Sequence, residues 1–289
     1  MTAGTNLRIL TAAILIPLVV AAVWWAPTWV VAAVAALVAV AALVEFFDMA
    51  ARLGFQAYRF WTGLAALAIM AEQWTTSQAA SIKNLGDLLY QARSPRLSLD
   101  LVLFLFLLGL AIIVLGSRRP LAESLPSVSV SVAGLVVIVL PFSAVVRLHG
   151  IDVSGPRLLL FTLVLVWAGD TAAYFAGRGF GRMKLAPQIS PNKTWEGAAA
   201  NLLAALLVAA VFGYYTRIQP AHMLAMAALG SIAGQIGDLF KSAFKRSAGV
   251  KDSGTILPGH GGIYDRIDAL IFAAPAVWFY FQWIVQRKF

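Results

Sequence analysis

The most constraining feature of this chain is a series of apolar runs, each about as long as a bilayer is thick. A helix needs about 20 apolar residues to cross the hydrocarbon core of a membrane. Such runs recur through most of the 289 residues, and the mean hydropathy is +0.82. Only 12% of the residues are charged, against roughly 25% in average soluble domains. The sequence therefore predicts an all-α, polytopic integral membrane protein.

We expect about nine transmembrane helices. The third of them is short for a span, and the first could instead be a secretory signal peptide. Its length and the Trp24–Trp25 pair, which is typical of a membrane interface, favour a retained anchor. The predicted spans are about Leu10–Trp25, Trp29–Phe47, Phe60–Ala71, Leu101–Gly116, Val128–Val146, Leu158–Gly177, Gly197–Tyr215, Met223–Phe240 and Ala269–Val285.

The basic residues predict an orientation for these helices. With the N-terminus in the cytoplasm, the larger share of the 22 Lys and Arg residues falls in cytoplasmic loops, as is usual for membrane proteins. The loop between the sixth and seventh spans and the loop between the eighth and ninth then share that side and can meet. We expect a single membrane domain, with N-terminal helices over 1–157 and catalytic helices with both loops over 158–289.

Net charge and composition exclude several classes of function. A net charge of +9 fits either cytoplasmic loops near anionic membrane lipids or an anionic substrate. Nucleic acid is not expected as a partner, because no soluble domain carries a basic face. The absence of cysteine excludes disulfides, a Cys nucleophile and thiolate metal sites. A metal here would use oxygen or imidazole ligands, which favours Mg²⁺, Mn²⁺ or Ca²⁺.

One carboxylate, Asp170, lies inside the sixth predicted span. An acid in an apolar span is costly, at about 2.5–3.5 kcal/mol on insertion scales, and it usually faces a cavity or a partner. Asp170 can therefore line a substrate cavity, or it can form an ion pair that packs two helices. The sequence leaves both interpretations open.

A second polar cluster, residues 189–197, reads Ile-Ser-Pro-Asn-Lys-Thr-Trp-Glu-Gly. Ser190 or Asn192 could cap the seventh helix, and Glu196 fits its first turn. Lys193 does not fit this interpretation, because the helix dipole disfavours a cation at the N-terminal end. An anion bound at the start of the helix would resolve that conflict.

The densest polar stretch runs from Asp238 to Asp268. Asp265 and Asp268 are three residues apart, so on a helix they share a face. Together with Asp238 they offer up to three carboxylates, and oxygen ligands suit Mg²⁺, which commonly bridges substrate phosphates. Lys241, Lys245 and Arg246 follow Asp238 at helical spacing. The alternative is that these acids and bases simply neutralise one another in salt bridges.

A glycine-rich turn, residues 259–262, separates the basic residues from the last two acids. A turn with so little side chain lets backbone amides approach a ligand closely. Acids for a hard cation, bases for polyphosphate and a glycine turn at a membrane surface are typical of phosphoryl or nucleotidyl transfer onto a lipid. Such reactions depend mainly on positioning and charge neutralisation.

These motifs resemble those of a known family, the phosphatidate cytidylyltransferases (CDP-diacylglycerol synthases). The resemblance is strong from about Leu158 to the C-terminus and rests on hydropathy alone in the first half. The matching motifs are Ser242-x-x-Lys245-Arg246, Lys251-Asp252-Ser253-Gly254, Leu257-Pro258-Gly259-His260-Gly261-Gly262, Asp265-Arg266-x-Asp268 and Ser190-Pro191-Asn192-Lys193-Thr194-Trp195-Glu196-Gly197.

The resemblance implies that CTP and phosphatidic acid react, with Mg²⁺, to give CDP-diacylglycerol and pyrophosphate. It further implies a bacterial inner membrane, with the active site on the cytoplasmic face. Asp238 and Asp265 would be the best metal ligands, with Asp268 weaker, and a second cation is left open. The catalytic residues would be Asp238, Asp265, Lys245 and Arg246. The substrate-binding residues would be Ser190, Asn192, Lys193, Lys251, Asp252, His260, Gly261, Gly262, Arg266 and Asp170.

One position departs from the family pattern. Bacterial members often read Gly-Asp-x-x-Glu-Ser where this chain has Lys241 in place of the Glu. The substitution reverses a charge beside the proposed metal, and it argues against an essential acid at that position.

The sequence leaves two alternative functions open. One is a related CTP-dependent lipid transferase or kinase with another acceptor, since the motifs indicate the nucleotide better than the acceptor. The other is a transporter that uses Asp170 as an ion-coupling site. The oligomeric state is left open, with a homodimer as one alternative.

Overall fold

The protein is almost entirely helical. The computed structural model describes residues 3–79, 97–152, 154–216, 218–254 and 261–286, without the side chains of 3–12 and 78–79. Within these ranges, seven helical segments are long and apolar enough to cross a membrane, which confirms the prediction of an all-α polytopic membrane protein. They are Thr28–Arg52, Leu99–Gly116, Leu121–His149, Gly155–Phe180, Trp195–Tyr215, Pro220–Ser247 and Tyr264–Val285.

The other two predicted spans are helical but do not belong to these seven. Helix α1 (Ala3–Trp25) has described side chains only over Ala13–Trp25, which is apolar, so the first predicted span stays a prediction. Helix α3 (Arg59–Ala79) is longer than predicted, but its second half contains Glu72, Gln73 and several hydroxyl side chains. Those polar residues lower its hydropathy below that of the seven spans.

The chain divides into two compact units, which are described separately. The first comprises residues 1–155 with 252–264, and the second comprises 156–251 with 265–289. The predicted assignment of 1–157 to N-terminal helices and 158–289 to catalytic helices stays a prediction. The first unit contains α1, α2 (Thr28–Arg52), α3, α5 (Leu99–Gly116), α6 (Leu121–Gly134), η1 (Leu135–Val139), α7 (Leu140–Phe142) and α8 (Ala144–His149).

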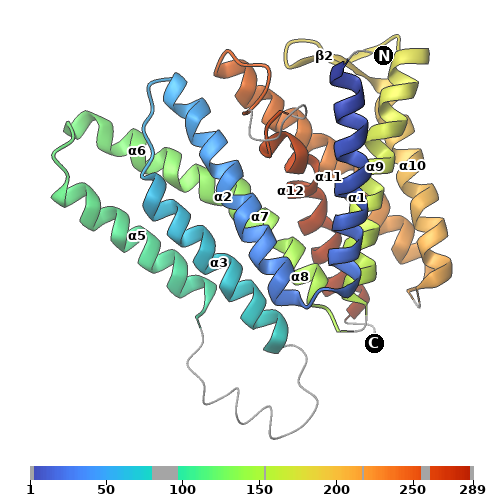
Figure 1. The fold of residues 1–289 in the computed structure, drawn as a ribbon, viewed down its shortest axis with the longest axis horizontal. Coiled ribbons are helices and arrows are strands. Elements are labelled where there is room, and N and C mark those ends of the chain that lie inside the picture. Colours follow the sequence, from blue (N-terminus) through green and yellow to red (C-terminus); the bar gives the residue numbers. More distant parts are fainter. Residues whose placement is uncertain (1–2, 80–96, 153, 217, 255–260, 287–289) are drawn as a thin grey trace, which may run out of the picture. The chain divides into compact units, whose positions relative to one another are not determined.

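Helix α2 is the centre of packing in the first unit. It contacts α3, α6, η1 and α8 (Figure 1). Its buried face carries Ala35, Ala39 and Ala42, each at most 3% exposed, and such small residues let helices approach closely in a membrane. Larger side chains on the same helix, Leu43 and Phe47, fill the space beside Gly134 of α6. The buried side of this apolar helix therefore faces protein.

The second unit holds the remaining long helices and the only strands in the described residues. Its elements are α9 (Gly155–Phe180), β1 (Lys184–Ala186), β2 (Ser190–Thr194), α10 (Trp195–Tyr215), α11 (Pro220–Ser247), α12 (Tyr264–Tyr280) and η2 (Phe281–Val285). The two strands form an antiparallel hairpin that was not predicted. Helix α10 packs along α11, and the hairpin contacts the start of α10.

Helices α11 and α12 approach closely through a line of glycines, Gly230, Gly234 and Gly237. A Cβ on Gly237 would lie 2.7 Å from the carbonyl oxygen of Asp268, and one on Gly230 would lie 3.1 Å from Val277. No real side chain tolerates the first of these distances without a shift of the backbone. This line of glycines, the glycine stripe, therefore fixes the spacing of the two helices that carry most of the predicted acidic residues.

Candidate active site

A buried lysine, Lys241, is the centre of the polar cluster in the second unit. It lies on α11 and is 4% exposed. Its Nζ is 2.9 Å from Asp265 Oδ1 and 3.7 Å from Asp238 Oδ1, and it also contacts Asp268 Oδ2. A charge buried this deeply is tolerated only when it is paired and hydrogen-bonded. The three predicted metal ligands thus converge on a single ammonium group.

Local helix geometry explains this convergence. Asp238, Lys241 and Lys245 are spaced at i, i+3 and i+7 on α11, so they share one face. Asp265 and Asp268 share a face of α12 in the same way, as predicted. Because the glycine stripe brings the two helices together, the acidic face of α12 meets the basic face of α11.

Two further lysines flank this cluster. Lys193 on β2 lies 2.5 Å from Asp238 Oδ2, and Lys245 lies 2.6 Å from Asp265 Oδ1. The side chains of Lys193 and Asp238 are 27% and 32% exposed, whereas those of Lys245 and Asp265 are 12% and 11% exposed. Lys193 and Asp238 are therefore the pair that a ligand in solution reaches more easily.

The hairpin carries Lys193 to this position. Strand register pairs Lys184 with Thr194 and Ala186 with Ser190. Arg246, at the end of α11, donates from Nε to the carbonyl oxygen of Ile189 at 3.1 Å. The connection between α9 and α10 therefore contacts the last turns of α11, as expected for two motif-rich segments that meet.

The predicted helix cap at this hairpin was wrong. Ser190 and Asn192 lie in β2, and the residue that caps α10 is Thr194, whose Oγ1 accepts from the Gly197 N–H at 3.1 Å. Glu196 lies in the first turn of α10, as predicted, and accepts from the Arg182 N–H at 3.0 Å. The strand displaces the cap because its residues are extended up to Thr194. The proposed role of Ser190 and Asn192 in substrate binding stays a prediction.

Asp170 belongs to the same polar region. It lies on α9, within electrostatic range of Asp238, Lys193 and Lys241. Its Oδ1 is 3.5 Å from Asn201 Nδ2 on α10. Asp170 is exposed and lies next to the cluster rather than in an isolated ion pair. Its predicted role in lining a substrate cavity stays a prediction.

A short polar track continues from Asn201, and sequence reasoning missed it. Ser231 Oγ donates to Asn201 Oδ1 at 2.7 Å, and Gln235 Nε2 donates to Ser231 Oγ at 3.2 Å. A Cβ on Gly169 would lie 2.7 Å from Asn201. Polar side chains in apolar spans were the signal that could have revealed these residues, as it did for Asp170.

The remaining predicted binding residues lie at or beyond the end of α11. Arg246, Lys251, Asp252 and Arg266 are exposed. Lys251 belongs to the second unit and Asp252 to the first. His260 lies outside the described residues.

Glycine is required at Gly261 and at Gly262 of the predicted turn for two different structural reasons. Gly261 has φ +78°, a left-handed conformation that favours glycine. A Cβ on Gly262 would lie 2.4 Å from Glu45 Oε2 on α2. Glu45 is a further residue that the sequence analysis missed. An acid inside an apolar span was the signal that could have revealed it, as it did for Asp170.

The donor chemistry of the cluster fits a divalent cation that takes two carboxylates. In the described residues, no group of three or more His, Cys, Asp or Glu side chains has the spacing of a complete metal site. Asp268 is already engaged through both oxygens, with Lys241 and with the Ala269 N–H. Asp238 is also paired through both oxygens, with Lys241 and Lys193, and Asp265 Oδ1 is paired with Lys241 and Lys245. The described side chains thus show the salt-bridge arrangement that was the alternative. The roles of Asp238 and Asp265 as ligands of Mg²⁺, which commonly binds through one or two carboxylates plus substrate phosphates and water, stay a prediction.

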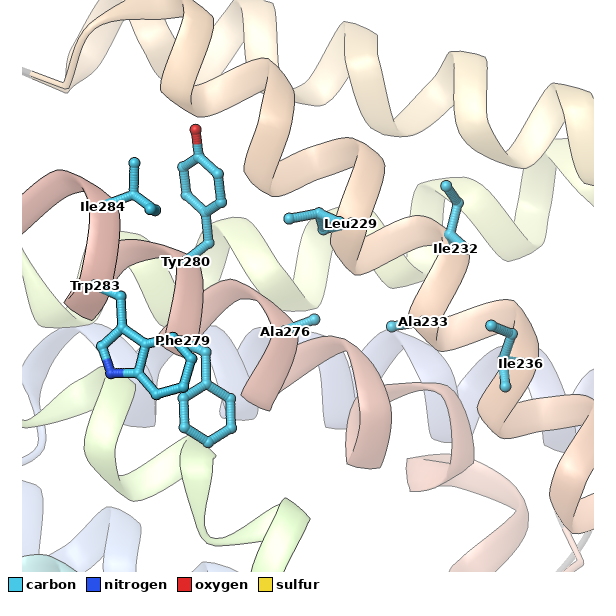
Figure 2. Close-up of a pocket in the computed structure, with 9 residues that line it drawn as sticks. All are labelled: Leu229, Ile232, Ala233, Ile236, Ala276, Phe279, Tyr280, Trp283 and Ile284. Atoms are coloured by element: carbon cyan, nitrogen blue, oxygen red, sulfur yellow. The ribbon is translucent and has the colours of Figure 1, made fainter.

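An apolar pocket of about 370 Å³ lies on the same two helices (Figure 2). Leu229, Ile232 and Ile236 of α11 line one side, and Ala276 and Tyr280 of α12 line the other. Its walls carry no carboxylate or lysine. It therefore offers mainly contact to hydrocarbon and no charged group to pair with a phosphate.

Comparison with known proteins shows which family has a similar sequence. Residues 6–284 match the profile of a group described as the cytidylyltransferase family. Similar proteins include phosphatidate cytidylyltransferases of Bacillus subtilis (strain 168), 41% identical over 140 residues, and Haemophilus influenzae (strain ATCC 51907), 45% identical over 136 residues. A third, from Brucella suis biovar 1, is 45% identical over 141 residues.

These alignments are partial. They cover 48%, 44% and 46% of this chain and 52%, 46% and 50% of the respective relatives. The chain thus spans about half the length of the curated relatives that it matches.

Proposed function

The chain belongs to the cytidylyltransferase family, and on that premise we propose that it transfers CMP from CTP to phosphatidic acid. The products are CDP-diacylglycerol and pyrophosphate. The observation that carries this proposal is the meeting of lysines and aspartates from three elements, β2, α11 and α12, around Lys241. Similarity to named phosphatidate cytidylyltransferases supports the choice of substrates.

The proposed reaction needs no covalent enzyme intermediate. A phosphate oxygen of phosphatidic acid attacks the α-phosphorus of CTP. The bond from that phosphorus to the oxygen bridging the α- and β-phosphates breaks, and pyrophosphate leaves with the electron pair. In such a displacement the protein mainly positions the reactants and neutralises developing charge.

The lysines supply the positive charge for this step. We assign binding of the triphosphate or the lipid phosphate to Lys193 and Lys245. The exposed Arg246 and Lys251, which follow Lys245 in the sequence, are proposed to share this role. Lys193 and Lys245 are paired with aspartates in the structure. An incoming phosphate would therefore compete with a carboxylate for each of them.

Asp238 and Asp265 are proposed to hold Mg²⁺ together with substrate phosphate oxygens. When bound, the ion would neutralise phosphate charge and hold the triphosphate in place. Lys241 would keep Asp268 and its neighbours close together even before the ion arrives. This differs from family members with Glu at that position, where the net charge of the cluster would be more negative by about two charges.

The site is proposed to lie at the cytoplasmic face of a bacterial inner membrane. The positive-inside distribution of Lys and Arg supports this orientation. The lipid substrate would reach the site from the bilayer, and CTP would reach it from the cytoplasm.

The direct test uses purified full-length protein in lipid nanodiscs, incubated with CTP and phosphatidic acid, with and without Mg²⁺. We expect CDP-diacylglycerol and pyrophosphate in equal amounts, and only with the metal. Asp265→Asn should abolish the product, while Asp48→Asn, an exposed carboxylate on α2, serves as the matched control. Turnover by Asp265→Asn close to that of the unsubstituted protein would contradict the proposal.

The alternatives give different products in the same experiment. A CTP-dependent lipid kinase would release CDP and a phosphorylated lipid rather than pyrophosphate. A panel of acceptor lipids, including a polyprenyl lipid, identifies a different acceptor. A transporter would move its substrate across sealed vesicles without CTP, and the proximity of Asp170 to the Lys241 cluster argues against that role.

A further inference from the structure

The first unit contains a buried carboxylate that the proposed reaction does not yet use. Glu45 lies near the end of α2 and is 2% exposed. An ionised group at such a site needs several hydrogen bonds to replace its lost hydration. Its partners come from a segment more than 200 residues further along the chain, since Ser253 is 208 positions away.

Both oxygens of Glu45 accept hydrogen bonds from the segment between α11 and α12. Oε2 accepts from Ser253 Oγ at 2.7 Å and from the Tyr264 N–H at 2.9 Å. Oε1 accepts from the Ile263 N–H at 2.9 Å. One carboxylate thus fastens both described ends of this segment, residues 252–254 and 261–264.

Two of these donors lie at the start of a helix. Tyr264 is the first residue of α12, and its N–H is one of those that no residue within the helix can satisfy. A carboxylate at this position also interacts favourably with the helix dipole. Phe46, the neighbour of Glu45, contacts the ring of Tyr264 edge-on at a centroid distance of 6.5 Å. Helix α2 therefore holds the start of α12 by two adjacent side chains.

Two motif glycines have close contacts with Glu45. A Cβ on Gly254 would lie 2.4 Å from Glu45 Oε1, and a Cβ on Gly262 would lie 2.0 Å from Ser253 Oγ and 2.4 Å from Glu45 Oε2. Any larger residue at Gly262 would displace both the serine and the carboxylate. Gly254, Gly262 and Ser253 of the motifs are therefore shaped around a residue outside the motifs.

We propose that Glu45 is a positioning residue for the reaction, a role that rests on the proposed function. It holds the segment that follows Lys251 and the first residue of α12. Tyr264 is covalently followed by Asp265, which is a proposed metal ligand. Fixing the backbone at Tyr264 therefore restricts where Asp265 can be placed at the moment of reaction. Small displacements of such supporting groups commonly lower metal affinity or activity about 10- to 100-fold.

The first readout is hydrogen exchange in the full-length protein without substrate, on peptides covering residues 261–268. Glu45→Ala should increase exchange at the Ile263 and Tyr264 amides at least ten-fold, because both lose their acceptor. Glu45→Gln should cause a smaller increase, since its amide keeps one acceptor oxygen. Peptides from the middle of α2 should not change. Unchanged exchange at 261–264 in Glu45→Ala would overturn the proposal.

The second readout is turnover with CTP and phosphatidic acid. We expect kcat/KM to fall about 100-fold in Glu45→Ala and about ten-fold in Glu45→Gln, as for other supporting residues. The apparent affinity for Mg²⁺, measured by titration of activity and of thermal stability, should fall in parallel. If exchange rises while kcat/KM and Mg²⁺ affinity stay unchanged, Glu45 is only structural and the positioning role is refuted.

Glu72→Gln is the control for loss of a buried carboxylate in the same unit. Glu72 lies on α3, is 5% exposed and accepts from Thr76 Oγ1 at 2.8 Å. This variant should leave exchange at 261–268 and turnover unchanged. If Glu45→Ala fails to fold, Ser253→Ala and Gly262→Ala test the same anchor from the other side. Absence of any turnover in the unsubstituted protein would refute the proposed function, while the exchange experiment would still test the anchor.

Discussion

The two buried charges, Lys241 and Glu45, are accommodated by different means. Lys241 is surrounded by three carboxylates, all of them ionisable side chains. Glu45 is bound by two backbone N–H groups and a hydroxyl, all of them neutral donors. Side-chain ion pairs can be exchanged when a phosphate or a cation enters, because the partners can rotate. Backbone donors cannot rotate away, so the Glu45 arrangement suits a fixed support and the Lys241 arrangement suits a site that binds and releases ligands.

Removing the buried cation is expected to have the largest effect. Lys241→Met keeps an unbranched side chain of similar volume but leaves Asp238, Asp265 and Asp268 without their shared ammonium. Breaking a buried ion pair in this way commonly costs about 3–5 kcal/mol. Thermal unfolding in detergent should show this loss, and added Mg²⁺ should recover part of it.

The control for this change is Lys184→Met on β1, an exposed lysine for which we expect little change in stability. A Lys241→Met protein as stable as the unsubstituted one would show that the three carboxylates do not need the ammonium.

The second effect concerns catalysis rather than folding. Asp265→Asn removes a charge that pairs with Lys241 and Lys245 and that is proposed to bind Mg²⁺. We expect kcat/KM to fall at least about 100-fold, comparable to the loss of one preorganised electrostatic group in other enzymes. Asp268→Asn should affect turnover less, since Asp268 is the weaker of the proposed ligands. Equal losses in the two variants would contradict this ranking of the ligands.

The third prediction tests the hydrogen bonds that Glu45 accepts. Glu45→Ala and Ser253→Ala form a double-mutant cycle across the 2.7 Å hydrogen bond. A hydrogen bond to a charged group contributes about 1.5–3 kcal/mol, so we expect a coupling energy of that size in the free energy of unfolding. Thermal or denaturant unfolding of the four proteins measures it. Additive effects would mean that Ser253 and Glu45 act independently.

The smallest effect on stability is expected at the hairpin. Lys193→Ala removes the partly exposed pair with Asp238, and such pairs contribute about 0–1 kcal/mol. The KM for CTP should nevertheless rise, about ten-fold if one phosphate contact of roughly 1.4 kcal/mol is lost. Steady-state kinetics at varied CTP, together with thermal unfolding, separates the two effects. A large loss of stability with an unchanged KM would assign Lys193 a structural role instead.

The sequence predicted which side chains of the Lys241 cluster share a helix face, because that information is local. Asp265 and Asp268 share a helix face by spacing alone, and Lys241 and Lys245 share another. The membrane class was predictable for the same reason, because the length of each apolar run can be compared directly with the thickness of a bilayer. The structure added the ammonium at the centre of the acids, which spacing within one helix could not show.

The hairpin and Glu45 were not predictable in this way. Strands β1 and β2 form because they pair with each other and contact the start of α10, while the turn between them contacts the end of α11. Pro191 and Asn192 in β2, and Pro187 in the turn, are instead typical of loops. Glu45 acquires its role only through partners 208 to 219 positions away. Neither contact leaves a periodic pattern in the sequence.

The distance between Glu45 and its partners limits how far the protein can be reduced. The motif-rich half of the chain would remain intact in a fragment beginning near Leu158, yet such a fragment would leave the Ile263 and Tyr264 amides without their acceptor. A minimal version of the protein would therefore have to retain α2, or to supply a carboxylate there by other means. The apolar first half is thus more than a membrane anchor for the second.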